Sequence, residues 1–339
     1  MSASHRDSQL IGDSAELHFL RAQITRVAAS DIPILIEGPT GSGKELVAQA
    51  LHAESGRTGL LVAVNVCAIA DTMFEDAMFG HVRGAFSGAI GEHGGHLIEA
   101  HRGTVFLDEI GGLPLGAQIK LLRALETREF RPVGARNDRS SDFRLVTATN
   151  VPLSRAVATG AFRPDLAFRL SGAAIRVPAL AAHPEDIPAI ARHFAERAAA
   201  QRGISVELSD GALTLLSARP WPGNVRELKH VVQCLVAFAT SSRIGREEVV
   251  SVLGDDREVD RDDSGPFERR RLLDTLRAFA WDTARTADHL GIHQSSIYRR
   301  VRRLGIDIRA LRSDEAAGVR GTRKAGALTD PREGLPSAM

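Results

Sequence analysis

Short apolar runs alternate with segments of helical periodicity over the first half of the chain. Five runs are apolar almost throughout, and several end in polar residues, a pattern typical of buried parallel strands. Between them, apolar residues recur every three to four positions, as in helices that cover a sheet. The alternation predicts an α/β fold with a parallel sheet covered on both faces. We expect strands at residues 34–37, 60–66, 104–109, 144–150 and 173–177, and helices within 10–30, after 44, at 71–80 and at 115–126.

The second half of the chain has a different pattern. From residue 185 to about 252 the periodicity is helical throughout, and we expect helices at 187–200, 210–217 and 224–239. A stretch rich in Asp, Arg and Gly follows, and a second compact helical unit comes after it. The pattern predicts an α/β domain at 8–180, a small all-α subdomain at 181–252, a linker at 253–266, an all-α domain at 267–309 and a disordered tail at 310–339.

Glycines interrupt the pattern directly after the first strand. A strand, a glycine-rich turn and a helix start are the context of a phosphate-binding loop, in which backbone N–H groups and the helix dipole converge on the anion. The spacing fits GxxxxGK[ST], except that Glu45 replaces the hydroxyl. A glycine-rich surface turn is the alternative, but the chain has only four lysines, and one stands here. We expect this loop to bind ATP through Gly38, Pro39, Thr40, Gly41, Ser42, Gly43, Lys44 and Glu45.

Two acidic residues close the third predicted strand. Asp108 is expected to hold Mg²⁺ against the phosphates, and Glu109 to polarise the attacking water. A solvated strand end is the alternative, but the combination of this pair with an upstream phosphate-binding loop favours catalysis. Phosphoryl transfer also needs further positive charge, for which Arg163 and Arg169 are candidates.

The C-terminal region is strongly basic. Residues 268–312 hold eleven arginines and five acidic residues, whereas the whole chain has a formal net charge of only +1. Within this region the sequence predicts a helix at 283–290, a glycine turn and a second helix at 293–304, the plan of a helix-turn-helix. A helical hairpin with solvated arginines is the alternative. The residues expected to contact DNA are Arg285, His293, Gln294, Ser295, Ser296, Tyr298, Arg299, Arg300, Arg302 and Arg303.

Composition excludes several other classes of protein. Cys67 and Cys234 lie in apolar sequence surroundings and indicate neither a disulfide framework nor a metal site. The N-terminus carries no apolar signal segment, and no apolar run is long enough to cross a bilayer. We therefore expect a cytoplasmic protein without a membrane segment.

These motifs together resemble the AAA+ activators of sigma-54 RNA polymerase, the bacterial enhancer-binding proteins, over residues 8–309. The resemblance implies an AAA+ P-loop NTPase domain with a parallel sheet, an all-α lid subdomain and a Fis-type helix-turn-helix domain. In this family the phosphate-binding loop ends in Gly-Lys-Glu, as it does at Glu45. The segment Gly84-Ala85-Phe86-Ser87-Gly88-Ala89 resembles the family's Gly-Ala-Phe-Thr-Gly-Ala loop, which contacts sigma-54.

The resemblance also implies roles for single residues. Asn65 matches the asparagine that holds the catalytic glutamate inactive, and Asn150 matches the first sensor of the γ-phosphate. Arg226 matches the second sensor, in the segment Trp221–Lys229. Arg163 and Arg169 match arginines that reach the ATP of a neighbouring subunit, which implies a homo-oligomer, from a dimer to a hexameric ring.

Three departures from the family pattern leave a question open. Ser87 replaces threonine, Val82 replaces a charged residue, and residues 181–183 replace an Arg-Glu-Arg run. The first hypothesis is an activator that binds upstream double-stranded DNA and uses ATP hydrolysis to remodel sigma-54 holoenzyme. The alternative is a DNA-binding AAA+ regulator that acts with ordinary polymerase. A remodelling ATPase without a promoter role is a third, disfavoured hypothesis. Since the chain begins almost directly at the AAA+ domain, we expect either a separate regulatory protein or its own expression level to control it.

Overall fold

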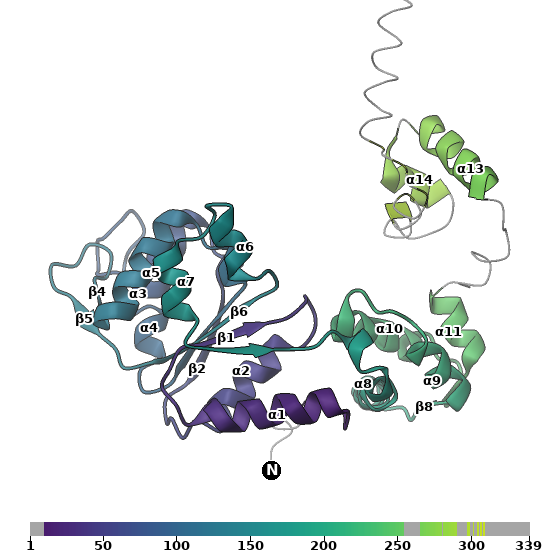
Figure 1. Ribbon diagram of the computed structural model, residues 1–339, viewed down its shortest axis with the longest axis horizontal. Coiled ribbons are helices and arrows are strands. Elements are labelled where there is room, and N and C mark those ends of the chain that lie inside the picture. Colours follow the sequence, from purple (N-terminus) through teal and green to yellow (C-terminus); the bar gives the residue numbers. More distant parts are fainter. Residues whose placement is uncertain are drawn as a thin grey trace, which may run out of the picture. The chain divides into compact units, whose positions relative to one another are not determined.

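The computed structural model describes residues 10–253, 265–279, 281–289 and the positions 297, 298, 301, 304, 306 and 308. The chain forms two compact units, residues 1–254 and 255–339. The first unit contains an α/β body and a helical lid, and the second contains the C-terminal helices (Figure 1).

A five-stranded parallel sheet in the order β2-β3-β6-β1-β7 is the centre of the α/β body. The strand that leads into the phosphate-binding loop, β1, lies between β6 and β7, so its carboxyl end is enclosed on both sides. The strands are β1 (Ile34–Glu37), β2 (Leu61–Asn65), β3 (Thr104–Asp108), β6 (Arg144–Thr149) and β7 (Ala173–Arg176).

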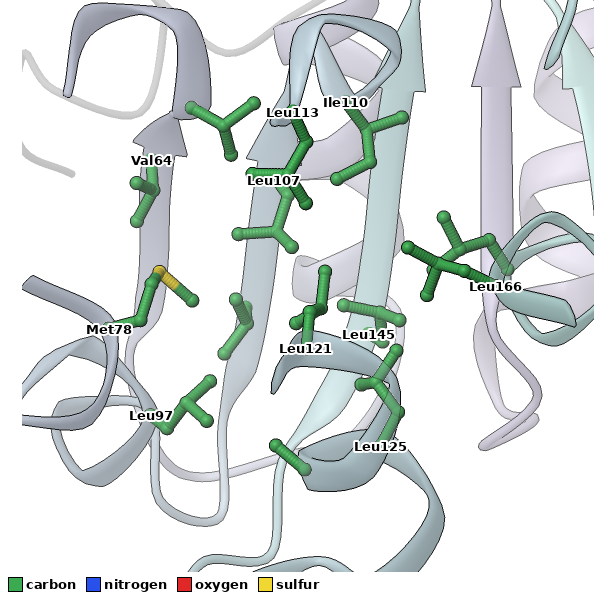
Figure 2. Close-up of a cluster of buried hydrophobic side chains, with 14 of the residues drawn as sticks. Val64, Met78, Leu97, Leu107, Ile110, Leu113, Leu121, Leu125, Leu145 and Leu166 are labelled. Atoms are coloured by element: carbon green, nitrogen blue, oxygen red, sulfur yellow. The ribbon is translucent and has the colours of Figure 1, made fainter. Parts of the chain in front are cut away.

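Helices cover both faces of this sheet, as the alternating pattern predicts. Along β1, Ile34 and Ile36 pack with the helices of one face, whereas Leu35 belongs to the cluster on the other face. One face carries α1 (Ala15–Ala28) and α2 (Lys44–Ala53). The other carries α3 (Phe74–Phe79), α4 (His96–Glu99), α5 (Leu115–Thr127), α6 (Leu153–Ala158) and α7 (Pro164–Leu170). Figure 2 shows side chains of this second face packed together.

Two predicted elements of the α/β body differ in detail. The second strand is an edge strand and alternates between buried and more exposed residues, because Val62 and Val64 pack into the cluster on one face while the residues between them point to the other face. The connection between the predicted helix at 115–126 and the predicted strand at 144–150 contains a short hairpin, formed by β4 (Glu129–Phe130) and β5 (Arg139–Ser140).

The lid packs around a core of its own that includes Trp221, whose indole Nε1–H donates to the Leu216 carbonyl at 2.8 Å. Its helices are α8 (Ile187–Gln201), α9 (Asp210–Ser217), α10 (Asn224–Phe238) and α11 (Arg246–Leu253). It also holds a two-stranded parallel pair that the helical periodicity did not predict, β8 (Glu207–Leu208) and β9 (Arg243–Ile244).

The second unit has a small apolar core. Its described helices are α13 (Gly265–Ala278), which begins two positions before the predicted domain start, and α14 (Thr283–His289). The core residues are Leu272, Leu276, Trp281, Ala287, Ile297, Val301 and Ile306. The predicted tail at 310–339 and residues 254–264 of the predicted linker lie outside the described residues. None of the helices that the structure describes is both long and apolar enough to cross a membrane.

Candidate functional site

A cleft of about 330 Å³ lies between the phosphate-binding loop and the lid. One end is polar and is lined by Gly41, Ser42, Gly43, Lys44 and Asp108. The rest of the wall comes from α1 and the segment before it, from α2, from the residues after β7 and from the lid helices α8 and α10. Most of these residues are apolar, and the polar and charged ones are Glu45, Gln49, His183, His193, Arg197, Arg226 and Lys229. A cleft with one anion-binding end and one apolar end has the chemical form of a nucleotide site.

The phosphate-binding loop has the predicted strand-turn-helix geometry. Gly41 and Gly43 have φ angles of 77° and 97°, which a residue with a Cβ rarely adopts. A Cβ on Gly41 would also overlap the carbonyl oxygen of Gly223 in the lid. The turn therefore needs glycine at position 41 both for its backbone angle and for its contact with the lid.

Lys44 is buried at the N-terminus of α2, with its ammonium group directed back at the loop. Its Nζ donates to the carbonyl oxygens of Gly38 at 3.0 Å and Pro39 at 3.2 Å. Burial lowers the pKa of Lys44 below its usual value, although Asp108 and Glu109 oppose this shift. A buried cation held only by neutral carbonyls is able to exchange one of them for an anionic oxygen.

The same loop contains a polar atom without a partner. The Oγ of Ser42 is fully buried and makes no hydrogen bond to any residue that the structure describes. Glu45, in contrast, is exposed, and its Oε1 accepts from Gln49 Nε2 at 3.5 Å. The unpaired hydroxyl, the buried Lys44 and the glycine turn all fit a phosphate group bound in this loop.

Asp108 and Glu109 stand at the carboxyl end of β3, as predicted. Asp108 lines the cleft, and its Oδ1 accepts the backbone N–H of Glu109 at 2.9 Å. Glu109 has φ 56° and ψ 37°, the left-handed region, in which a residue with a side chain is strained. Strained backbone of this kind occurs mainly at functional sites, so the angle supports a special role for this glutamate.

Asn65 ends the neighbouring edge strand but does not contact Glu109 through a hydrogen bond in the described part of the chain. Its Oδ1 accepts the backbone N–H of Cys67 at 3.0 Å. Cys67 in turn directs its Sγ at the Glu109 carbonyl oxygen at 3.6 Å. The side chain of Cys67 is exposed, so the expectation of apolar surroundings, which came from its sequence neighbours, is wrong. The proposed role of Asn65 stays a prediction.

Two asparagines fix the phosphate-binding loop from outside it. Asn150, after β6, donates its Nδ2–H to Thr40 Oγ1 at 3.1 Å, so this predicted sensor does meet the loop. Asn224 was not singled out from the sequence, yet its Nδ2 donates to the Thr40 carbonyl at 3.0 Å. Its Oδ1 also accepts the Leu180 N–H at 2.9 Å. The sequence signal that could have identified Asn224 is its position after Pro222-Gly223 in a turn, since asparagine tolerates a positive φ such as the 53° found there.

Arg226 follows in the same turn of the lid. Its side chain lines the cleft, and its backbone N–H donates to the Gly41 carbonyl at 3.2 Å. Asn224 and Arg226 together give two hydrogen bonds from the lid to adjacent carbonyls of the loop. The predicted second sensor thus lies at the site.

Arg163 and Arg169 do not line this cleft. Arg163 directly precedes the short helix α7, and Arg169 lies in its last turn. Arg163 pairs with Asp165 on the surface, with Nη2 and Oδ2 2.7 Å apart. The exposed Arg169 donates to the Leu125 carbonyl at 3.0 Å. Any contact of these arginines with a nucleotide must therefore come from a different copy of the chain or from a rearrangement.

The segment Gly84–Ala89 forms a compact exposed turn. The Gly84 N–H donates to the Ala89 carbonyl at 2.9 Å, and the Ala89 N–H donates to the Phe86 carbonyl at 3.0 Å. Phe86 packs against the ring of His81, with centroids 5.0 Å apart, and His81 pairs with Asp76. Ser87 and Gly88 are exposed, whereas Ala85 is partly covered. The predicted contact loop is thus on the surface, and its Phe86 ring packs against His81.

The predicted DNA-contact residues are described only in part. Arg285 and Tyr298 are exposed, and the Tyr298 hydroxyl accepts a hydrogen bond from the Thr283 hydroxyl at 3.1 Å. The other candidates, His293, Gln294, Ser295, Ser296, Arg299, Arg300, Arg302 and Arg303, lie outside the described residues. Within the described ranges, no group of three or more His, Cys, Asp or Glu side chains is arranged to hold a metal ion.

Comparison with known proteins agrees with this geometry. Residues 10–176 match the sigma-54 interaction domain, residues 181–265 the AAA+ ATPase lid domain, and residues 265–304 the Fis family of bacterial regulatory proteins. Over 303 residues the chain is 38% identical to the transcriptional regulatory protein ZraR of Klebsiella oxytoca, covering 87% of this chain and 68% of that protein. The chain belongs to the sigma-54 interaction domain family.

Other members of the sigma-54 interaction family extend beyond the matched region. The chain is 42% identical over 246 residues to the transcriptional regulator NtrC of Rhizobium meliloti and spans 51% of its length. It spans 63% of the regulatory protein LuxO of Vibrio cholerae, at 38% identity. A crystal structure of NtrX from Brucella abortus in complex with ATP superposes with a TM-score of 0.65 at 34% identity, covering 88% of this chain and 69% of NtrX.

Proposed function

We propose that this chain is an ATP-dependent transcriptional activator that binds enhancer DNA and remodels sigma-54 RNA polymerase holoenzyme. The observation that carries the proposal is the cleft in which Lys44, Asp108 and Arg226 line one site within a sigma-54 interaction family member. An ATP-bound structure of the related NtrX supports the choice of nucleotide. The apolar end of the cleft gives the base a place away from water.

The residues of the cleft divide the work of hydrolysis between them. The loop amides and Lys44 hold the phosphates, and the unpaired Ser42 hydroxyl is available to them. Asp108 is the carboxylate that would hold Mg²⁺, which supplies positive charge to the transferred group. Glu109, next in the chain, orients the attacking water and accepts its proton.

Arg163 and Arg169 support an oligomeric form of the active enzyme. Phosphoryl transfer gains from an arginine placed at the developing charge, and neither of these two residues lines the cleft of its own chain. Both lie on or beside the exposed helix α7. We infer that they reach the nucleotide of a neighbouring copy, so that a homo-oligomeric ring, a hexamer at full assembly, is the hydrolysing state.

The Gly84–Ala89 turn is the proposed contact with sigma-54. Its exposure and the Phe86 ring supported by His81 suit a surface that changes position with nucleotide state. The helix-turn-helix match at 265–304 and the basic charge of that region support binding of double-stranded DNA. A cytoplasmic location and control by a separate regulatory protein complete the proposal.

ATP hydrolysis and promoter opening, measured separately, test this function. We expect Glu109→Gln to keep ATP binding and to lose turnover by about 100-fold or more, because the water loses its base. We expect Ser87→Ala to keep turnover and to lose open-complex formation with sigma-54 polymerase, because position 87 lies on the exposed turn and does not line the cleft.

Two outcomes contradict the proposal. Wild-type protein that hydrolyses ATP but opens only promoters of ordinary polymerase would favour a DNA-binding AAA+ regulator without sigma-54, for which the serine at position 87 is the sequence argument. Loss of both activities in Ser87→Ala, with an unchanged thermal unfolding midpoint, would show that the turn has been assigned wrongly.

A further inference from the structure

A histidine lies in the wall of the cleft, in the part that is mostly apolar. His183 lines the cleft together with Leu10, Ile11, Pro178 and Ile190. Only 4% of its surface is exposed. A buried imidazole needs hydrogen-bond partners for both ring nitrogens, so its surroundings show which nitrogen is available to a ligand.

One ring nitrogen is already occupied. The Nδ1 of His183 lies 2.9 Å from Asp186 Oδ2. The other oxygen of that carboxylate accepts the backbone N–H groups of Asp13 at 2.8 Å and Ser14 at 3.1 Å. Burial raises the pKa of Asp186, but the bonds from Ser14, Asp13 and His183 outweigh burial and bring it below the usual value. The carboxylate therefore stays ionised and fixes the orientation of the ring.

The second ring nitrogen of His183 makes no hydrogen bond to any residue that the structure describes. In the neutral ring, Nδ1 is the donor to the carboxylate, so Nε2 carries a lone pair and is an acceptor. Among the described residues, the fully buried side-chain polar atoms without a partner are Ser42 Oγ and Arg144 Nε. His183 Nε2 is not one of them, and no described residue bonds to it, so this nitrogen is not fully buried. The open space that His183 lines is the cleft.

We propose that His183 recognises the base of the bound nucleotide, by accepting a hydrogen bond at Nε2 from the exocyclic amino group of a 6-aminopurine. The inference rests on the proposed function, which places the phosphates at Lys44 and hence the base at the apolar end. A 6-oxopurine presents an oxygen at the same position, and two facing acceptors repel each other. His183 thereby selects adenine over hypoxanthine or guanine nucleotides.

The other histidine of the cleft provides a matched control. His193 also lines the cleft, but it is only partly buried, and its ring packs edge-on against Phe194 with centroids 5.6 Å apart. Base recognition that needs a fixed acceptor should therefore depend on position 183 and not on position 193.

Binding of ADP and inosine diphosphate, measured by calorimetry on the full chain, tests the assignment without any turnover. Wild-type protein is expected to prefer ADP by about tenfold or more. His183→Leu should weaken ADP about three- to tenfold and leave inosine diphosphate almost unchanged. His183→Gln should bind both ADP and inosine diphosphate, since an amide can either donate or accept. Its preference for ADP should disappear because it binds inosine diphosphate more tightly than wild-type protein does. His193→Leu should keep the wild-type preference.

The outcomes separate this inference from the function on which it rests. Wild-type protein that binds neither nucleotide would overturn the proposed function together with the role of His183. Wild-type protein that binds ADP, with an unchanged preference in His183→Leu, would overturn the role of His183 alone. The role of His183 would also be overturned if His183→Leu lost affinity equally for both nucleotides, or if His193→Leu and not His183→Leu changed the preference. Thermal unfolding of the variants without nucleotide identifies any loss caused by misfolding.

Discussion

Two glycine-rich turns of this chain look alike in sequence but differ in what surrounds them. In the phosphate-binding loop, a Cβ on Gly38 would lie 2.8 Å from the Val177 carbonyl, and one on Gly41 would overlap the Gly223 carbonyl. In the exposed turn, a Cβ on Gly84 or Gly88 would meet nothing within 4 Å. The first turn is enclosed by other backbone, whereas the second projects into open space.

The difference shows two separate reasons for glycine. Gly84 and Gly88 have φ angles of 80° and 105°, so glycine serves only the backbone conformation there. At Gly41 the angle and the contact with the lid act together. The phosphate-binding loop should therefore tolerate very little change, and the exposed turn should tolerate substitution at a small cost in stability.

The largest effect is expected for Gly41→Ala. Its positive φ costs about 1–2 kcal/mol and the overlap with Gly223 about 1–3 kcal/mol more, so we expect nucleotide affinity to fall by about 100-fold. Calorimetry with ADP measures the loss. Gly43→Ala is the matched control, because its φ is also positive but the nearest atom to the added Cβ, Leu46 Cδ1, is 3.8 Å away. Equal losses in the two variants would show that overlap contributes nothing.

A smaller effect is expected at the lid residue that encloses the loop. Asn224→Ala removes the acceptor of the buried Leu180 N–H and the donor to the Thr40 carbonyl. We expect the free energy of unfolding to fall by about 2–3 kcal/mol, measured by urea denaturation. Asn224→Asp keeps the acceptor and loses only the donor, so it should lose less. If the aspartate variant were the less stable of the two, the bond to Leu180 would not be the main contribution.

The smallest effect is expected in the exposed turn. Gly88→Ala should lower the free energy of unfolding by about 1 kcal/mol, the cost of a side chain at positive φ, and should leave ADP affinity within about twofold of wild type. Denaturation and calorimetry on the same preparation check both values. A loss of nucleotide affinity comparable to that of Gly41→Ala would remove the distinction between the two turns.

The strands, the phosphate-binding loop and the acidic pair were predictable because each depends on residues adjacent in the chain. Thr104–Asp108 and Arg144–Thr149 follow from their apolar runs, and α1, capped by Ser14, lies within the predicted range 10–30. The glycines of the phosphate-binding loop and Lys44 have a spacing that is specific to phosphate-binding loops. Local patterns were sufficient for this part of the molecule.

Contacts between distant segments were not predictable in this way. Asp186 bonds to Asp13 across 173 positions, and Asn224 bonds to Thr40 across 184. Arg144 begins a strand, yet it is fully buried and donates to the carbonyls of Val27, Ala28 and Leu51. Its partners are the carboxyl ends of α1 and α2, and no single-sequence pattern brings a strand and two helix ends together.

The segment of residues 10–14 combines two attachments. Leu10 and Ile11 form part of the cleft wall, and the next residues bond through their backbone to the lid carboxylate of Asp186. Gly12, between them, leaves room for that carboxylate, since any Cβ there would overlap it. A displacement of this short segment must therefore move the lid and reshape the cleft at once. A mechanical signal arriving through the chain ahead of Leu10 would change nucleotide affinity without altering any group that touches a phosphate.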